Sequence, residues 1–199
     1  MTFELWNSLA TTATFLVVAA AAIAAIVQLR HMRSSNQILV LDSLLKESAV
    51  PEFAEAQHFV FTELSGILRD PAFRYQLVQR DARVPANQAF MTKAFLVGNF
   101  YNYMGELVKR RLLDAEIACE YWGQVTTAWD ALLPIIAITR RSDPRIWENF
   151  EYVAVLVQDY VRAHPGGGYP RGVRRLTVND DWIEADTEYA ASIERRPEV

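Results

Sequence analysis

The hydrophobic pattern begins with a long uncharged run. Residues 5–29 are 25 consecutive positions without a charged side chain, and positions 15–27 are almost entirely Ala, Val, Ile and Leu. As a helix the run would extend about 37 Å, which exceeds the roughly 30 Å hydrocarbon core of a bilayer. We therefore predict a transmembrane helix over residues 9–29, preceded by a short N-terminal segment of residues 1–8.

A cleaved signal peptide is the alternative interpretation of this run. Such a peptide has a positive N-terminal region and a short apolar core, whereas residues 1–8 contain Glu4 and no Lys or Arg. An uncleaved anchor is therefore favoured. Arg30 and Arg33 follow the run, and basic residues beside a span are retained in the cytoplasm. We expect an inner (cytoplasmic) membrane location with the N-terminus outside, with Trp6, Arg30 and Arg33 near the headgroups.

The apolar pattern continues at helical spacing beyond the span. No Pro or Gly interrupts residues 1–50, so the span is expected to continue as one helix to near Ser48, with a hinge open at residues 34–36. Pro51 and Pro85 suit the first turns of later helices. A cytoplasmic helical domain of about five helices is predicted over residues 30–164. These helices are expected over residues 51–68, 71–80, 85–113, 115–139 and 144–163.

Three further polar and proline signals refine these boundaries. Asp114 is a predicted N-cap, and Pro134 is expected to kink or end the helix that contains it. Ser142, Asp143 and Pro144 together predict the start of the last core helix. Because no segment alternates apolar and polar residues between turn signals, the expected fold class is all-α.

The C-terminal tail differs in composition from the preceding domain. Residues 165–199 begin with Pro, Gly and Arg, which is typical of an exposed linker. A short amphipathic helix is predicted later in the tail, with Trp182, Tyr189 and Ile193 on one side. Such a helix is marginal alone, so these residues are predicted to dock on the domain of the same chain, or alternatively on a partner.

Composition narrows the classes of function. The formal net charge of −4 and the pI near 5.4 argue against nucleic-acid binding, which usually requires a basic excess. The one cysteine, Cys119, cannot form an internal disulfide. Its neighbours Ala118 and Glu120 provide no positive charge to activate a thiolate, so Cys119 is interpreted as a packing residue.

The search for catalytic chemistry excludes most motifs. The chain has no Gly-Lys pair for a phosphate-binding loop, and His31, His58 and His164 lack metal-ligand spacing. Glu148 and Glu151 share a helix face and are the best candidates for a general acid and base. However, acidic residues also favour the first turn of a helix, so the structural interpretation is preferred. We expect no catalytic residue, no metal ligand and no cofactor.

Two features are candidates for interaction. In the span, Ala20 with Ala24 and Ala21 with Ala25 are small residues four apart, which permit close helix contact in lipid, although alanine is also ordinary filler. Basic residues form two clusters at predicted helix ends, where they either satisfy helix carbonyls or contact anionic lipid. The clusters are Lys109, Arg110 and Arg111, and Arg140, Arg141 and Arg145.

Several motifs together indicate a family. The span is followed by Gln28-Leu29-Arg30 and by residues 33–37, and the domain contains Gly98-Asn99-Phe100-Tyr101 and residues 147–152 with the sequence WENFEY. In these features the chain resembles the bacterial membrane proteins grouped as domain of unknown function 4760, over roughly residues 5–163. The resemblance implies an anchored helical cytoplasmic domain and no catalytic residues.

The leading hypothesis is a single-pass, non-enzymatic scaffold or accessory subunit of a membrane protein complex. Its expected partners are the lipid bilayer and another membrane protein or a second copy of the chain. The alternatives are a peripheral sensor of anionic lipid that uses the arginine clusters, and a membrane-tethered hydrolase or signalling enzyme that uses Glu148 and Glu151.

Overall fold

The computed structural model describes residues 3–78, 85–170, 172–177, 182, 186, 187 and 189. Within these residues every regular element is a helix, which confirms the predicted all-α class. The chain forms two compact units, Met1–Gly167 and Gly168–Val199. Most of the tail helix predicted to include Trp182 and Tyr189 lies outside the described residues, as does Ile193, so tail docking stays a prediction.

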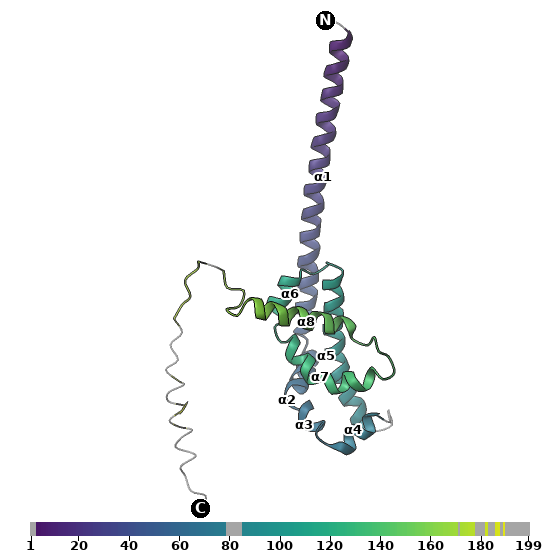
Figure 1. The fold of residues 1–199 in the computed structure, drawn as a ribbon, viewed down its shortest axis with the longest axis vertical. Coiled ribbons are helices and arrows are strands. Elements are labelled where there is room, and N and C mark those ends of the chain that lie inside the picture. Colours follow the sequence, from purple (N-terminus) through teal and green to yellow (C-terminus); the bar gives the residue numbers. More distant parts are fainter. Residues whose placement is uncertain are drawn as a thin grey trace, which may run out of the picture. The chain divides into compact units, whose positions relative to one another are not determined.

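Helix α1 (Phe3–Ser48) carries the apolar run into the helical domain (Figure 1). It passes without a break through residues 34–36, where the sequence left a hinge open, and it ends at Ser48 as the pattern predicts. The most apolar part of α1 is exposed along its length, whereas Leu44 near its end is only 1% exposed within the core. One helix thus combines a candidate span with an element of the domain core.

The remaining helices follow the proline and aspartate signals. Pro51, Pro71 and Pro85 each open a helix, because proline has the backbone φ of the first turn and lacks an N–H that would go unpaired there. Asp114 is an N-cap as predicted, since its Oδ1 accepts a hydrogen bond from the backbone N–H of Glu116 (2.9 Å). The bounds are α2 Pro51–Thr62, α3 Leu64–Ile67, α4 Pro71–Val78, α5 Pro85–Lys109, α6 Ala115–Tyr121, α7 Val125–Thr139 and α8 Glu148–Ala163.

Helix α5 is the central helix of the domain. It packs against α2 and α7 and most extensively against α8, which crosses it at a steep angle (Figure 1). The crossing is close because Gly98 and Gly105 of α5 carry no side chain. A Cβ at Gly98 would overlap the Trp147 ring, and a Cβ at Gly105 would overlap the backbone carbonyl of Asn149. Their seven-residue spacing places both glycines on one face of α5.

An asparagine between the two glycines caps the helix that they contact. Oδ1 of Asn102 accepts hydrogen bonds from the backbone N–H groups of Asn149 (3.2 Å) and Phe150 (3.3 Å). These amides lie in the first turn of α8, where no intrahelical carbonyl is available to them. A side chain from α5 therefore performs the capping that usually comes from the residue before the helix.

The start of α8 differs from the prediction. Residues 144–147 form a turn, and α8 begins at Glu148 rather than at Pro144. Trp147 has the left-handed conformation, with φ 55° and ψ 35°, which a right-handed helix cannot include. Its indole N–H donates to Oδ1 of Asn99 (2.8 Å). A contact with α5 therefore holds Trp147 in the conformation that keeps α8 from starting earlier.

The end of α5 also differs from the prediction. The helix ends at Lys109, not near Leu113, because Arg111 has a φ of 59°. The N–H of Leu112 then bonds to the carbonyl of Leu107 (2.9 Å), which is the bond of a Schellman motif. Glycine normally signals this ending in a sequence, and here arginine occupies the position.

A third correction concerns the helix predicted from Ala115 through Pro134. It is divided into α6 and α7 at Trp122, whose φ of −121° and ψ of 47° leave the helical region. The Trp122 side chain is 3% exposed and packs near the Phe100 ring. Pro134 does not end α7, because the carbonyl of Asp130 that loses its partner belongs to an exposed part of the helix.

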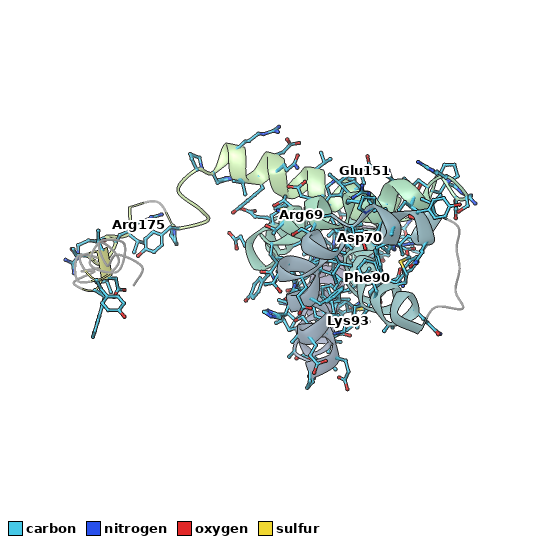
Figure 2. The ribbon with its side chains drawn as sticks, turned by 90° about the horizontal axis from the view of Figure 1, so that it is seen from below. Arg69, Asp70, Phe90, Lys93, Glu151 and Arg175 are labelled. Atoms are coloured by element: carbon cyan, nitrogen blue, oxygen red, sulfur yellow. The ribbon has the colours of Figure 1, made fainter. Side chains whose placement is uncertain are left out.

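The core between α2, α4 and the N-terminal half of α5 is aromatic. The Phe90 ring of α5 lies 5.6 Å from that of Phe59 in α2 and 4.9 Å from that of Phe73 in α4, measured between ring centroids. Lys93, next to Phe90 in Figure 2, places its ammonium group 5.1 Å from the centre of the Phe59 ring. These contacts attach α2 and α4 to the N-terminal half of α5.

The close crossing predicts unequal effects for two glycine substitutions. Gly105→Ala should lower the free energy of unfolding by about 1–3 kcal/mol, because the new methyl group meets backbone that cannot turn aside. Gly66→Ala, where a Cβ meets nothing within 4 Å, should change it by no more than about 1 kcal/mol. Urea unfolding of the full chain in detergent, followed by near-ultraviolet circular dichroism, measures both. Equal losses would contradict the close crossing.

Candidate functional site

The residues of the predicted span and its flanks lie on α1. Within the described residues, α1 is the helix long and apolar enough to cross a bilayer. Trp6 is 64% exposed near its start. The alanine face and the two basic residues after the span are also exposed. These residues are Ala20, Ala21, Ala24, Ala25, Arg30 and Arg33.

The carboxylates proposed as an acid and base pair have separate partners. Oε1 of Glu148 lies 3.7 Å from Nζ of Lys109, and Oε2 of Glu151 (labelled in Figure 2) lies 2.7 Å from Nη2 of Arg140. Both carboxylate side chains are about half exposed. Each ion pair therefore joins α8 to the end of another helix, which is a structural role at the surface.

The two basic clusters have different environments. Lys109, Arg110 and Arg111 lie at the end of α5, and Arg110 pairs with Glu106 of the same helix (2.8 Å). In the second cluster, Arg140 turns inward. Its Nε donates to the carbonyl of Ile146 (3.2 Å), and its guanidinium group lies 5.5 Å from the centre of the Trp129 ring. Arg140 thus connects α7 to α8, and only the first cluster is wholly exposed.

The ionisable side chains of Cys119 and Tyr101 are not activated as nucleophiles. Burial, reinforced by the negative charge of Asp114, raises the pKa of the Cys119 thiol from 9.0 to about 11. Burial also raises the pKa of Tyr101 to about 12, and its hydroxyl accepts a hydrogen bond from Nε2 of Gln57 (2.9 Å). Neither group is a nucleophile near neutral pH. Among the described residues, no group of three His, Cys, Asp or Glu side chains is placed to hold a metal ion.

The described residues line an apolar cavity that is open to solvent and that the sequence did not predict. Its volume is about 760 Å³, and it lies between α4, α5 and the end of α7. Its walls are mainly hydrocarbon and aromatic side chains. These are Leu77, Met91, Phe95, Leu96, Ile138 and Ile146. Its volume lies within the range of small-molecule sites, but Leu96 and Asn99 of its lining are exposed.

Most polar residues in the cavity lining are uncharged. Neutral side chains provide most of them, and Asp143 provides a carboxylate whose Oδ1 accepts from the backbone N–H of Arg145 (3.1 Å). No lysine or arginine is among the described lining residues. The neutral polar residues are Gln76, Gln88, Thr92, Asn99, Thr139 and Ser142.

The cavity shares its wall with the α5–α8 crossing. Asn99 lines the cavity and accepts the Trp147 indole hydrogen bond, and Phe95 packs against the Trp147 ring with 5.1 Å between centroids. A sequence signal for the crossing exists, because Gly98 and Gly105 share a helix face with an asparagine between them. No pattern in one helix could reveal the cavity, because its walls come from segments distant in the sequence.

The fold and these sites define an all-helical protein with an apolar N-terminal helix long enough to span a membrane. A family model described as Domain of unknown function (DUF4760) matches residues 15–156, which is more than half of the chain, so the protein belongs to that family. The matched region includes both sides of the α5–α8 crossing. Comparisons with curated proteins and with solved structures each found no match.

The raised thiol pKa predicts the pH dependence of alkylation. In the folded chain, Cys119 should react with iodoacetamide far more slowly than a free cysteine at pH 7.5, because the thiolate is a minor species. Its rate should be half-maximal only near pH 11, whereas the rate of an ordinary thiol is half-maximal near pH 9.0. Mass spectrometry of timed samples, with unfolded chain as the control, measures this. A half-maximal rate already near pH 9.0 would contradict it.

Proposed function

We propose that the protein is a single-pass, non-enzymatic scaffold or accessory subunit of a membrane protein complex. In this proposal α1 spans the inner membrane with its N-terminus outside, and the helical domain lies in the cytoplasm. The partner is another membrane protein or a second copy of the chain. The span supplies location, and the domain presents a fixed surface beside the bilayer.

The main support for this proposal is that α1 runs without a break from the apolar segment into the domain core. Its apolar part has no cover within the described structure, while Leu44 on the same helix is buried with the partly buried Val40 and Leu41 beside it. A rigid connection of this kind favours a role in which the position of the domain relative to the membrane matters. The carboxylate pair gives less support to a hydrolase, because Glu148 and Glu151 are in surface ion pairs and neither lines the cavity.

Extraction of the intact chain under mild conditions tests the scaffold role. The full-length protein, taken from its native membrane in polymer nanodiscs and crosslinked, should be recovered in a complex larger than the monomer. Mass spectrometry of the crosslinked peptides identifies the partner and the contacting residues. Recovery of the free monomer alone, before and after crosslinking, would exclude the proposal.

The alanine face predicts where part of the assembly contact lies. Ala20→Leu combined with Ala24→Leu should reduce the complex, because larger side chains keep a second helix at a distance. Ala19→Leu with Ala22→Leu is the matched control, since these positions lie on the opposite side of α1 at about 100° per residue. Size analysis of the crosslinked protein compares the two variants. Equal yields of complex would remove the alanine face from the proposal.

Anionic lipid contact is a second proposed role. The end of α5 lies at the end of the domain from which α1 emerges, and it carries Lys109, Arg110 and Arg111 (Figure 1). The exposed Leu112 follows these cations. Each cation near an anionic headgroup can contribute about 1 kcal/mol. The cluster at residues 140–145 gives less support, because Arg140 is bound within the domain.

Retained lipids test this second role. Native mass spectrometry of the full chain, extracted from mixed phosphatidylcholine and phosphatidylglycerol bilayers, should show preferential retention of phosphatidylglycerol. Arg110→Glu with Arg111→Glu should reduce that preference, because negative side chains repel the headgroups. Arg141→Glu with Arg145→Glu makes the same charge change in the other cluster and should have little effect. An equal reduction in both variants would contradict a specific contact at the end of α5.

A further inference from the structure

The segment that follows α8 concentrates positive charge and exposed apolar side chains. Residues 160–179 contain four arginines and no aspartate or glutamate. In the described part of this segment, both arginines are exposed, and the three apolar side chains near them are 45%, 55% and 77% exposed, respectively. The scaffold role proposed above gives these residues no function. We call them the tail cluster, which consists of Arg174 and Arg175 with Tyr169, Val173 and Leu176.

The tail cluster has a defined local structure. A turn closes at Val173, whose N–H hydrogen bond spans 3.4 Å, and Gly172 within this turn has a φ of 81°. The Tyr169 hydroxyl then donates to the carbonyl of Arg174 (3.2 Å). The guanidinium group of Arg175, labelled in Figure 2, lies 4.9 Å from the centre of the Tyr169 ring. The turn thus gathers the aromatic ring and the arginines in one place.

The composition of the tail cluster matches the surface of an anionic bilayer. At such a surface apolar side chains enter the boundary of the acyl chains, while arginine groups stay among the headgroups. A nucleic-acid backbone would satisfy the arginines alone and leave Val173 and Leu176 in water. The acidic residues of the tail begin only at Asp180, so positive and negative charges are separated along the chain. Charge and apolar exposure together therefore favour anionic lipid as the partner.

The length of the chain permits this contact. Between Leu29, where the predicted span ends, and the buried Leu44, α1 rises about 22 Å. Helix α8 lies in the half of the domain from which α1 emerges (Figure 1). The chain between Ala163, the last residue of α8, and Arg174 can extend about 36 Å. A segment tethered within this reach of a bilayer has a high effective concentration at its surface.

We propose that the tail cluster binds the anionic surface of the membrane that α1 spans, as a second attachment of the chain. Arg174 and Arg175 contact phosphate oxygens of the headgroups, and Val173 and Leu176 enter the apolar boundary. The lipid composition of the membrane then sets how firmly the tail is held there. This inference rests on the proposed position of α1 in the membrane, but not on the scaffold role.

Quenching by brominated lipid measures the contact in the full chain. Thr177→Cys places a fluorescent label beside the tail cluster, and the native Cys119 is only 6% exposed to the labelling reagent. In nanodiscs of brominated phosphatidylcholine, added phosphatidylglycerol should quench this label, and salt at roughly 0.5 M should reverse the quenching by screening the charges. Ser65→Cys, at an exposed position of α3 on the opposite end of the domain, is the control and should stay unquenched (Figure 1).

Paired charge variants separate this contact from the one proposed at the end of α5. Arg174→Gln with Arg175→Gln should lower the ratio of bound to free tail at least about tenfold, since each cation near anionic lipid contributes roughly fivefold. Removal of the same charge from α5, in Arg110→Gln with Arg111→Gln, should leave the quenching of the tail label unchanged. Asp180→Asn with Asp181→Asn should increase the quenching, because it removes charges that the headgroups repel.

Several results would overturn the proposal. These are quenching that is equal without phosphatidylglycerol, that persists at high salt, or that is the same after either pair of arginine substitutions. An unquenched tail label in protein that has entered the nanodiscs would also overturn it, and would leave the proposed position of α1 intact. Failure of the chain to enter nanodiscs would overturn both.

Discussion

The close crossing of α5 and α8 is the contact on which the domain depends. Gly98 and Gly105 permit the two backbones to approach, and the approach then determines the local structure around it. Asn102 reaches the amides at the start of α8, and Trp147 is held in a left-handed conformation by Asn99. A rare backbone conformation at a bulky residue persists only where its surroundings stabilise it, as the buried indole and its hydrogen bond do here. One wall of the apolar cavity is a product of the same contact.

The second constraint is the continuity of α1. One part of α1 is apolar and exposed, and another part is buried at Leu44. The same continuous helix therefore lies in two different environments. The exposed apolar part favours lipid, where its backbone hydrogen bonds are satisfied within the helix. The buried part fixes the helix in the domain core. The combination supports the proposed scaffold role, in which the domain is held at a defined position beside the membrane.

Much of the fold could be predicted from local signals. Pro51 and Pro85 begin helices, and Asp114 caps one, because each acts through its own backbone or the next few residues. The misplaced boundaries have a different origin. Trp147 and Trp122 leave the helical region because their rings are buried against other helices, so tertiary packing overrides local propensity. The carboxylates of α8 lie in separate surface ion pairs, whereas the cavity depends on distant segments that no local pattern relates.

The rigidity of the connection between span and domain is open to direct measurement. Hydrogen exchange of the full chain in nanodiscs should show continuous protection of the α1 amides from the end of the span to Leu44. In particular, the amides of residues 34–36 should exchange at least about tenfold more slowly than those of an unstructured peptide of the same sequence. Exchange of residues 34–36 at the unstructured rate, between protected segments on both sides, would mean that the span and the domain move independently, and it would contradict a rigid membrane-anchored scaffold.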